Sequence, residues 1–391
     1  MSQIASPTTS WDIRASCALS ARVQKALAAF VATPTPPLWQ GKKTVIYGAG
    51  VFGRDLARTL LQQNVTVLGF LDQKGAGQPV LGDLRAHSPA SLEAKRWLAE
   101  KPVALIGTHN FSVSLREIAR LLTVLGFEQV VTPMEIYLHL GRQLGWRFWL
   151  GTREVYAGAA DRIDLARALW ADAESQRLFL DTLLFRLEFD LDALTHISSE
   201  SVQYADPTVP RWKEPLRMVD GGAYTGDTLR SLLQHGYRFG AIHAFEPDLE
   251  NFRKLRDSVS AFAPETAISL WPCGISSKTG RLKFSEGDGV SSKLSEAGAA
   301  QVPVVALDDV LHGQPVNLIK LDIEGAEADA LKGARRVIEK YRPGLAVCLY
   351  HFPDHLWSIP LWVAELNLGY SFYCRTYAQS TFETVLYAIP A

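Results

Sequence analysis

A short segment in the C-terminal half, VDGGAYTGD at residues 219–227, combines carboxylates with glycines where an apolar run gives way to a helical pattern. Gly221, Gly222 and Gly226 let the backbone turn sharply and come close to a ligand, because a Cβ atom would clash there. Asp220 falls at the carboxyl end of the preceding strand, which is where α/β sheets bind ligands. The segment therefore predicts a ligand-binding turn.

A second acid, Glu246, ends the next predicted strand, AIHAFEP. It follows Asp220 by about one strand–helix–strand step, a position from which a carboxylate accepts hydrogen bonds from both ribose hydroxyls. A diphosphate would be repelled by the carboxylate of Asp220, because phosphate cradles present exposed amides. The acidic turn therefore favours a nucleoside with a cationic tail and no phosphate, and S-adenosylmethionine fits that description.

Charged residues also end a later apolar strand, LIKLDIE. Period-two alternation places Lys320, Asp322 and Glu324 on one face, if the strand continues so far. In one interpretation Lys320 and Asp322 form an ion pair, and Glu324 is the first-turn acid of the next helix. In the other, Asp322 acts on a ligand, because ligands gather at the carboxyl ends of strands. The sequence favours the second interpretation.

His351 directly follows the predicted strand LAVCLY. With a pKa near the unperturbed value of about 6.5, it could accept a hydroxyl proton during a transfer reaction. The alternative is a partly exposed loop histidine that is bonded to the backbone. Asp322 competes for the same proton, and His355 ranks behind both.

Four segments resemble the FkbM family of methyltransferases, in this order: DGGAYTGDT, FEPDLENFRKL, LDDVL and IKLDIEGAEADALKGA. The resemblance covers nearly the whole C-terminal half. It implies an S-adenosylmethionine-dependent O-methyltransferase that acts on hydroxyls of sugars, polyketides or related secondary products. The chain departs from the family's more usual DxGANxG turn at residues 222–224, which affects the side-chain hydrogen bonds of the turn rather than its role.

Most of the expected site residues lie in or next to these segments. The expected cofactor residues are Asp220, Gly221, Gly222, Tyr224, Gly226, Asp227, Thr228, Glu246, Pro247, Cys273, Gly274 and Asp322. The expected catalytic residues are Asp322, His351 and Glu324. Cys273 follows a proline, as the nucleophile of cytosine methyltransferases does, but it comes after the third strand rather than the fourth, so we expect a structural or adenine-lining residue. The Gly/Ser segment 287–296 is predicted to be a lid, and no metal site is predicted.

The N-terminal half contains a second glycine turn, GAGVFG, with Gly48, Gly50 and Gly53 after an apolar run and Asp72 at the end of the next one. This spacing fits the dinucleotide fingerprint. The segment also resembles the nucleotide-sugar-binding domain of some sugar acyltransferases. NAD and a nucleotide sugar are therefore both candidate ligands, and a purely structural Rossmann-like domain is the alternative.

The elements that would position these residues fall into four parts. Residues 1–40 form an N-terminal extension, 41–140 alternate strands with helices, 141–200 are a helical connector, and 201–391 alternate again and end in two strands. We predict an α/β protein with two doubly wound Rossmann-like domains joined by the connector. The C-terminal domain would be a class I methyltransferase fold of five parallel strands closed by a terminal antiparallel pair.

Composition limits the classes of partner. The chain has 391 residues, of which 47% are hydrophobic, with Lys+Arg 40 against Asp+Glu 41. This balance gives no basic footprint for nucleic acid, so we expect a small-molecule or glycan acceptor. Four widely spaced cysteines without a CxxC indicate neither a disulfide framework nor a zinc site. Because no signal peptide or membrane-spanning run is evident, we expect a cytoplasmic protein, and the sequence leaves open whether it forms a homo-oligomer.

Two other functions stay open at this stage. A nicotinamide-dependent oxidoreductase would use the turn from Gly48 to Asp72, although the YxxxK arrangement that would support it does not occur. A non-catalytic nucleotide-binding scaffold would keep both folds and bind cofactor without turnover.

Overall fold

The computed structural model describes residues 13–32, 35–192, 202–259, 266–285, 293–294 and 300–391. The chain divides into two compact units. Unit 1 comprises Met1–Thr108, Leu115–Arg142 and Thr152–Thr195, and unit 2 comprises His109–Ser114, Gln143–Gly151 and His196–Ala391. Two short segments of the N-terminal half therefore belong to the C-terminal unit. The predicted connector, residues 141–200, is shared between the two units.

Unit 1 is built on a six-stranded sheet in the order β3-β4-β2-β1-β5-β6. Its strands are β1 (Thr44–Tyr47), β2 (Val67–Leu71), β3 (Ala76–Leu81), β4 (Leu84–His87), β5 (Val103–Ile106) and β6 (Val130–Val131). All pairs are parallel except β3 with β4. The central strands β1 and β5 are fully buried apolar runs, as predicted. Strands β3 and β4 were not predicted, because their mostly unburied side chains lack that apolar pattern.

Eight helices of the described chain lie wholly or mainly in unit 1. They are α1 (Ile13–Val31), α2 (Val51–Gln62), α3 (Leu92–Leu98), α4 (Leu115–Leu125), α5 (Pro133–Leu144), α6 (Arg153–Tyr156), α7 (Ala160–Arg167) and α8 (Ala173–Glu188). Helix α8 starts where Asp172 accepts a hydrogen bond from the amide of Ser175 at 2.7 Å, a standard N-cap. Helix α1 packs against α8, and Arg22 pairs with Glu188.

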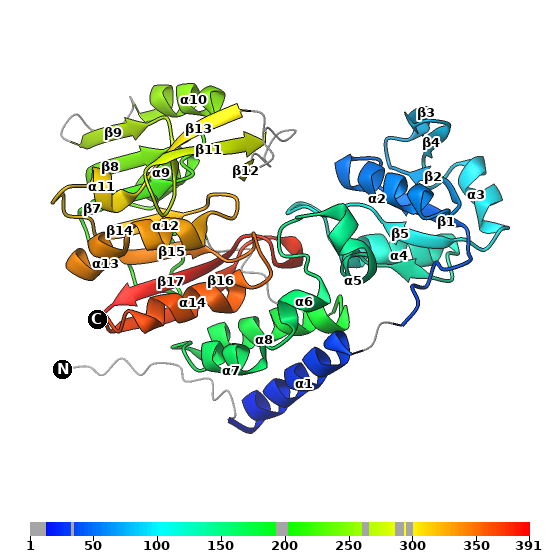
Figure 1. Ribbon diagram of the computed structural model, residues 1–391, viewed down its shortest axis with the longest axis horizontal. Coiled ribbons are helices and arrows are strands. Elements are labelled where there is room, and N and C mark those ends of the chain that lie inside the picture. The colour runs from blue at the N-terminus through cyan, green and yellow to red at the C-terminus, as the bar shows by residue number, and fades with distance from the viewer. Residues whose placement is uncertain (1–12, 33–34, 193–201, 260–265, 286–292, 295–299) are drawn as a thin grey trace. The chain divides into compact units, whose positions relative to one another are not determined.

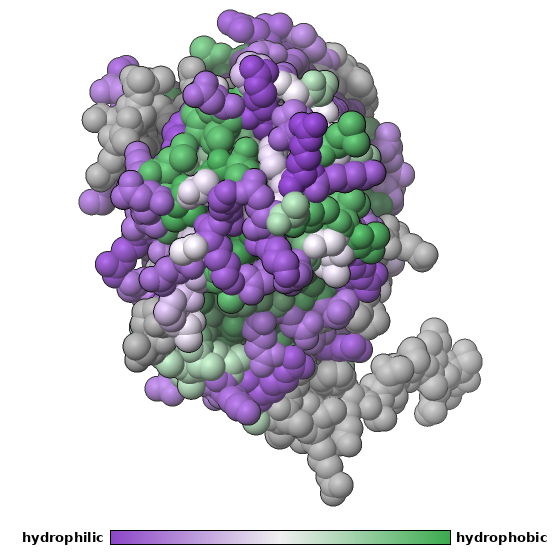
Figure 2. Space-filling model, turned by 90° about the vertical axis from the view of Figure 1, so that its right-hand side faces the viewer, coloured by the Kyte–Doolittle hydropathy of each residue, from purple (hydrophilic) through white to green (hydrophobic). Residues whose placement is uncertain are grey.

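The surface of the molecule carries apolar side chains in separate patches among hydrophilic ones. Figure 2 shows this for the face that lies to the right in Figure 1. Leu92 and Val124 are the most exposed large apolar side chains of unit 1. Scattered exposure of this kind is ordinary for a globular surface.

Unit 2 is built on a seven-stranded sheet in the order β16-β17-β15-β14-β7-β8-β9 (Figure 1). Its strands are β7 (Leu216–Gly221), β8 (Phe239–Phe245), β9 (Ala267–Trp271), β14 (Leu318–Leu321), β15 (Gly344–Cys348), β16 (Tyr370–Thr376) and β17 (Thr384–Pro390). The strands from β15 to β9 are parallel, and β17 is antiparallel to both of its neighbours. The predicted five parallel strands with a terminal antiparallel pair are confirmed.

The remaining elements of unit 2 include a second, smaller sheet. Its order is β10-β13-β11-β12, with β10 (Gly274–Ile275), β11 (Gly280–Ser285), β12 (Lys293–Leu294) and β13 (Ala300–Val305). The helices are α9 (Asp227–Gln234), α10 (Leu249–Val259), α11 (Leu307–Val310), α12 (Glu327–Gly333), α13 (Arg335–Tyr341), α14 (His355–Glu365) and the 3-10 turn η1 (Gln379–Thr381). The smaller sheet was not predicted. The predicted lid, residues 287–296, lies outside the described residues except for β12.

The larger sheet sets the position of the site. Strands β14 and β15 are buried along their whole length, so only their ends reach the surface. From β7 the chain continues to β8 on one side of β7, and β14 is the neighbour of β7 on the other side. The strand order therefore reverses between β7 and β14, and α/β sheets bind ligands at the carboxyl ends of strands at such a point. No helix in the described part of the chain has both the length and the apolar character that a membrane span requires.

Candidate functional site

A cavity of about 610 Å³ opens at the carboxyl ends of β7, β8, β14 and β15. All the residues that line it belong to unit 2. Part of its wall comes from His109–Ser114 and Gln143–Gly151, the two segments from the N-terminal half. The volume falls in the range of about 300–1,000 Å³ that is usual for small-molecule sites.

The turn between β7 and α9 needs its glycines for two different reasons. Gly222 has a φ of 72°, and a Cβ atom there would lie 1.9 Å from the carbonyl oxygen of Asp322. The backbone after β7 thus packs directly on the backbone after β14. Gly226 has a φ of 80° and is the N-cap of α9. Tyr224 between them also has a positive φ, of 45°, and its side chain is about half exposed in the cavity wall.

Asp220 and Lys320 form a buried ion pair under this turn. The two residues are opposite each other in the register of β7 and β14, and Lys320 Nζ lies 3.1 Å from Asp220 Oδ1. Lys320 Nζ also donates to the carbonyl oxygens of Gly221 and Gly222. Burial opposes the charge of Lys320, but the nearby carboxylates, Asp220 foremost, outweigh burial and raise its pKa. In place of the Lys320–Asp322 pair of the alternative interpretation, Lys320 pairs with Asp220 and holds the glycine turn.

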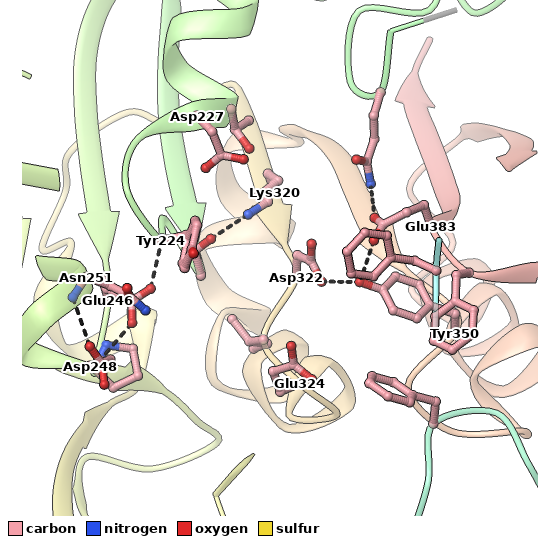
Figure 3. Close-up of a pocket in the computed structure, with 18 of the residues that line it drawn as sticks. Tyr224, Asp227, Glu246, Asp248, Asn251, Lys320, Asp322, Glu324, Tyr350 and Glu383 are labelled. Atoms are coloured by element: carbon pink, nitrogen blue, oxygen red, sulfur yellow. Dashed lines mark hydrogen bonds between the residues drawn. The ribbon is translucent and has the colours of Figure 1, made fainter. Parts of the chain in front are cut away.

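Glu246, at the end of β8, lies at the opposite side of the cavity (Figure 3). Its carboxylate accepts hydrogen bonds from the amides of Tyr224 at 2.8 Å and Asp248 at 2.9 Å. Burial raises the pKa of Glu246 above its ordinary value. The side chain is thus held in place by backbone amides, and it lines the cavity.

A second group of polar side chains lies across the cavity. The hydroxyl of Tyr350 donates to Asp322 Oδ1 at 3.1 Å and approaches Glu383 Oε1 at 3.3 Å (Figure 3). Gln203 Nε2 donates to the other oxygen of Glu383 at 2.8 Å. Burial, with a further contribution from Asp322, raises the pKa of Glu383 to about 7. Two carboxylates and a phenol therefore share one end of the cavity.

His351 lies beneath this group and is completely buried. Its Nδ1 is 2.8 Å from Glu327 Oε1, and its Nε2 is directed toward Asp322 and Glu324. Burial disfavours the imidazolium, but the surrounding carboxylates, Glu327 foremost, raise the pKa of His351 to about 10. The base role assumed a pKa near 6.5, and the surrounding carboxylates shift the pKa of His351 upward from that value.

The pKa values of two acids near His351, Glu324 and Glu327, shift in opposite directions. Burial raises the pKa of Glu324 to about 8, although His351 opposes that shift. Burial also acts upward on Glu327, but the contact with His351 outweighs it and lowers the pKa to about 2. Glu327 Oε1 accepts a hydrogen bond from the amide of Ile323 as well. Glu327 is therefore a fixed carboxylate that orients the imidazole.

Aromatic rings line the cavity beside Tyr350. The ring centroid of Phe148 lies 5.0 Å from that of Phe382 and 6.3 Å from that of Tyr350. Trp146 Nε1 donates to the carbonyl oxygen of His351 at 2.8 Å, which ties the segment Gln143–Gly151 to the end of β15. An aromatic wall of this kind can stack on a flat or ring-shaped ligand.

The structure brings most of the predicted site residues into one cavity. Those that line it are Gly222, Tyr224, Asp227, Thr228, Glu246, Pro247, Gly274, Asp322 and Glu324. Asp220 and His351 lie behind the wall and contact residues that line it. Gly221, Gly226 and Cys273 are also set back, and burial raises the pKa of Cys273 to about 11, which does not suit a nucleophile. Sequence analysis missed Tyr350, Glu383, Glu327 and Phe148, because each depends on contacts between distant segments.

The second glycine turn, in unit 1, has the backbone of a Rossmann-like turn. Gly48 has a φ of 103°, and a Cβ atom on Gly53 would lie 2.0 Å from the carbonyl oxygen of Gly48. Asp72 Oδ2 accepts a hydrogen bond from the amide of Ala49 at 3.1 Å. Gly50 is the N-cap of α2 and makes no side-chain cap. These contacts explain the glycines at positions 48 and 53 by backbone packing alone. Nucleotide binding at this turn therefore stays a prediction.

Comparison with known proteins agrees with the geometry of unit 2. The family described as the methyltransferase FkbM domain matches residues 220–372. Unit 2 carries an FkbM methyltransferase domain. The match begins at Asp220 and includes Glu246 at one end of the cavity and Asp322 and Tyr350 at the other.

Two individual proteins are similar to this chain. Hexuronic acid methyltransferase AglP from Haloferax volcanii is 30% identical over 104 residues, which cover 25% of this chain and 43% of the length of AglP. The crystal structure of methyltransferase FkbM from Methylobacillus flagellatus KT matches with a TM-score of 0.73 and 19% identity, over 95% of this chain and 100% of that one. At this identity the second likeness concerns the fold, which includes both units.

The cofactor that goes with the FkbM domain and its fold is S-adenosylmethionine. None of these comparisons supports NAD, so the oxidoreductase alternative has only the spacing from Gly48 to Asp72 in its favour.

Proposed function

We propose that the FkbM domain transfers the methyl group of S-adenosylmethionine to a hydroxyl of a sugar or glycan. The observation that carries this proposal is the single cavity with Glu246 at one end and Asp322, Tyr350 and Glu383 at the other. One end suits a nucleoside, and the other presents proton acceptors beside aromatic rings. The name of the relative AglP, a hexuronic acid methyltransferase, supports a sugar as the acceptor.

The cofactor would lie between the glycine turn and Glu246. The carboxylate of Glu246 would accept hydrogen bonds from the ribose hydroxyls, and Asp227 at the start of α9 would face the cationic methionine tail. Gly222 leaves room for the backbone to approach the cofactor. Asp322, which lines the same cavity, would lie on the side that receives the acceptor.

The reaction is a displacement at carbon. Bound S-adenosylmethionine would supply an activated methyl group, which the acceptor oxygen would take from the sulfur, so that S-adenosylhomocysteine would be the second product. The hydroxyl proton passes to the carboxylates of Asp322 and Glu383, which share the hydroxyl of Tyr350. Most of the rate would come from holding the oxygen in line with the carbon–sulfur bond.

The test combines cofactor binding with methyl transfer to defined sugars. The full chain is incubated with S-adenosylmethionine and with methyl glycosides of neutral hexoses and of hexuronic acids, and release of S-adenosylhomocysteine is measured. Product stability in mild base separates a methyl ether from a methyl ester. Binding of S-adenosylmethionine together with a base-stable methyl sugar supports the proposal, whereas a base-labile product would move the reaction to a carboxyl group.

Exchange of the acceptor-side carboxylates tests their role. Asp322→Asn and Glu383→Gln should each lower kcat, by roughly 10²-fold or more for a lost proton acceptor, and should leave the Kd for S-adenosylmethionine nearly unchanged. Glu365→Gln, at an exposed carboxylate at the end of α14, is the matched control. Wild-type turnover in both variants would show that positioning alone drives the transfer.

A further inference from the structure

We propose that Tyr350 and Gln203 are positioning residues that couple Asp322 and Glu383 into a single proton acceptor. The two carboxylates line the cavity, and so do Tyr350 and Gln203. The use of this acceptor in catalysis rests on the proposed methyl transfer, but the coupling itself can be measured without any methyl acceptor.

The hydroxyl of Tyr350 lies between the two carboxylates. Its oxygen is 3.1 Å from Asp322 Oδ1 and 3.3 Å from Glu383 Oε1. A phenol has only one hydrogen to donate, so it cannot satisfy both carboxylates in full. An oxygen of Asp322 and one of Glu383 also lie within 4.8 Å of each other. Each of two carboxylates so close disfavours the ionised form of the other, so a proton bound by one changes the proton affinity of both.

Tyr350 can bridge the carboxylates only if it keeps its own proton. Burial, followed by the charges of Asp322 and Glu383, raises the pKa of Tyr350 well above its ordinary value. Its ring packs on those of His351 and Phe382, at centroid distances of 4.2 Å and 5.8 Å. The phenol is therefore a fixed hydrogen-bond donor between two acceptors rather than a third base.

Gln203 holds the other oxygen of Glu383. Its Nε2 donates to that oxygen at 2.8 Å and to the hydroxyl of Tyr204 at 3.1 Å. The amide of Tyr204 donates to the hydroxyl of Tyr387 at 3.0 Å, so the backbone next to Gln203 is anchored on β17. Both carboxylate oxygens of Glu383 thus have a donor, and Oε1 is the one that faces Tyr350.

The charges around the pair determine how it titrates. Burial, and after it the charge of Asp322, raises the pKa of Glu383 to about 7. The hydrogen bond from Gln203, the charge of His351 and the hydrogen bond from Tyr350 act in the opposite direction. The other titratable groups that adjoin the pair or line the same cavity are Tyr204 before β7, Lys320 in β14, Glu324 and Glu327 at the start of α12, Cys348 in β15, and His109 and Arg147. Removal of the charge of Asp322 and removal of a hydrogen bond to Glu383 should therefore shift the titration of Glu383 in opposite directions.

In the proposed reaction the coupled pair takes up one proton. The acceptor hydroxyl loses its proton to the pair during methyl transfer, and the proton passes to water after the product leaves. The fully ionised pair is the stronger base, because each carboxylate raises the proton affinity of the other. Turnover should therefore rise with pH through about 7, where Glu383 loses its proton, and fall below it.

The experiment is a pH titration of the full chain, without cofactor or methyl acceptor, followed by infrared spectroscopy. The C=O stretching band of the protonated Glu383 carboxyl is identified by its absence in Glu383→Gln. In the wild type this band should disappear as the pH rises through about 7. Asp322→Asn should lower the midpoint by about one pH unit or more, because a like charge is removed. Tyr350→Phe and Gln203→Leu should each raise the midpoint, because each removes a donor to Glu383.

Two control variants remove the same chemical groups away from the cavity wall. Glu365→Gln removes a carboxylate and Tyr341→Phe removes a phenol, and both should titrate as the wild type does. An unchanged midpoint in Asp322→Asn would overturn the coupling. An unchanged or lower midpoint in Tyr350→Phe would overturn it as well, since a fall in both variants would mean only that water reaches Glu383. If Tyr350→Phe does not unfold cooperatively, the opposite shifts expected for Asp322→Asn and Gln203→Leu decide the result.

A second measurement follows methyl transfer to the sugars named above as a function of pH. The rise of kcat in Tyr350→Phe should move to higher pH by the same amount as its infrared midpoint, while the KM for the methyl acceptor changes little. A rise that stays in place would overturn the role of Tyr350 in the reaction. Infrared shifts without any methylated sugar would keep the coupled pair and count against the proposed function. Methyl transfer without infrared shifts would remove the coupled pair and leave the proposed function intact.

Discussion

At the scale of single residues, the site is organised by carboxylates in different surroundings. Among the described residues, Glu246 accepts hydrogen bonds from backbone amides and Glu327 contacts an imidazole. Asp322 accepts a hydrogen bond from a phenol. The same chemical group can therefore bind a ribose, orient a ring or accept a proton, because its role depends on its neighbours.

Glu246→Ala should weaken S-adenosylmethionine binding by about 2–3 kcal/mol, the usual loss for charged hydrogen bonds, because the variant cannot accept the ribose hydroxyls. Calorimetry measures the change. The control is Glu250→Ala, which removes an exposed carboxylate four positions along the chain, paired with Lys254. Equal affinity in the Glu246 variant and the control would show that the ribose binds elsewhere.

Cys273 should be unreactive in the folded protein. It is buried, as are Cys348 and Cys374, and burial raises its pKa to about 11, so the reactive thiolate is scarce at pH 8. In a Cys17→Ser chain, Ellman's reagent should label no thiol before unfolding and three afterwards. Rapid labelling of Cys273 in the native chain would restore it as a candidate nucleophile.

Sequence predicted the residues that end strands and missed those that reach the cavity across the fold. Asp220, Glu246 and Asp322 follow apolar runs, so alternation and spacing reveal them. Glu383 precedes β17, which lies beside β15 only because the last strand inserts between β15 and β16. No local sequence pattern predicts that β17 lies between β15 and β16. No local pattern predicts the pairing of Lys320 with Asp220 either, because the two residues lie on different strands, β14 and β7.

At the scale of elements, the glycine turn after β7 connects β7 to α9 along the chain and also packs against the end of β14. Its backbone packs on the residue that follows β14, and the ammonium of Lys320 binds its carbonyl oxygens. The parts of the cavity wall that follow β7 and β14 therefore support each other.

Gly222→Ala should be much more destabilising than Gly313→Ala. Both glycines have a φ above 70°, so both substitutions incur roughly 1–2 kcal/mol of backbone strain. Only Gly222 adds a clash, with a Cβ atom 1.9 Å from the oxygen of Asp322, whereas Gly313 has open space around it. Urea denaturation of both variants measures the difference, and equal losses would mean that the turn moves away from β14 freely.

The elements predicted best were the buried ones. Strands β1, β5, β14 and β15 are continuous apolar runs, a pattern typical of parallel strands covered on both faces. Strand β11, GRLKFS, has no such run, and it is held by pairing with β13. Its small sheet was therefore not visible in the sequence, since pairing partners cannot be read from propensity.

At the scale of the whole molecule, the N-terminal half supplies part of the site. The residues of His109–Ser114 and Gln143–Gly151 that line the cavity precede the matched FkbM domain, residues 220–372, by many positions. Ser380 Oγ donates to the carbonyl oxygen of Val113 at 3.4 Å, next to the turn that carries Glu383. The end of the cavity with Glu383 thus depends on residues outside 220–372.

A chain that begins at residue 196 should therefore still bind S-adenosylmethionine but should no longer bind the acceptor in position for transfer. The cofactor end, with Tyr224 and Glu246, is contained in that chain, so the Kd for S-adenosylmethionine should change little. The acceptor end would lack Trp146 and Phe148, and the rings of Tyr350 and Phe382 would become exposed, so a hydrophobic dye should bind more strongly than to the full chain. Methyl transfer should fall by at least about tenfold, because the oxygen is no longer held in line with the methyl carbon. Phe148→Ala in the full chain is the milder counterpart and should raise the KM for the acceptor more than it changes cofactor binding. Transfer at the full rate by the shortened chain would show that residues 220–372 and their immediate neighbours form the whole site.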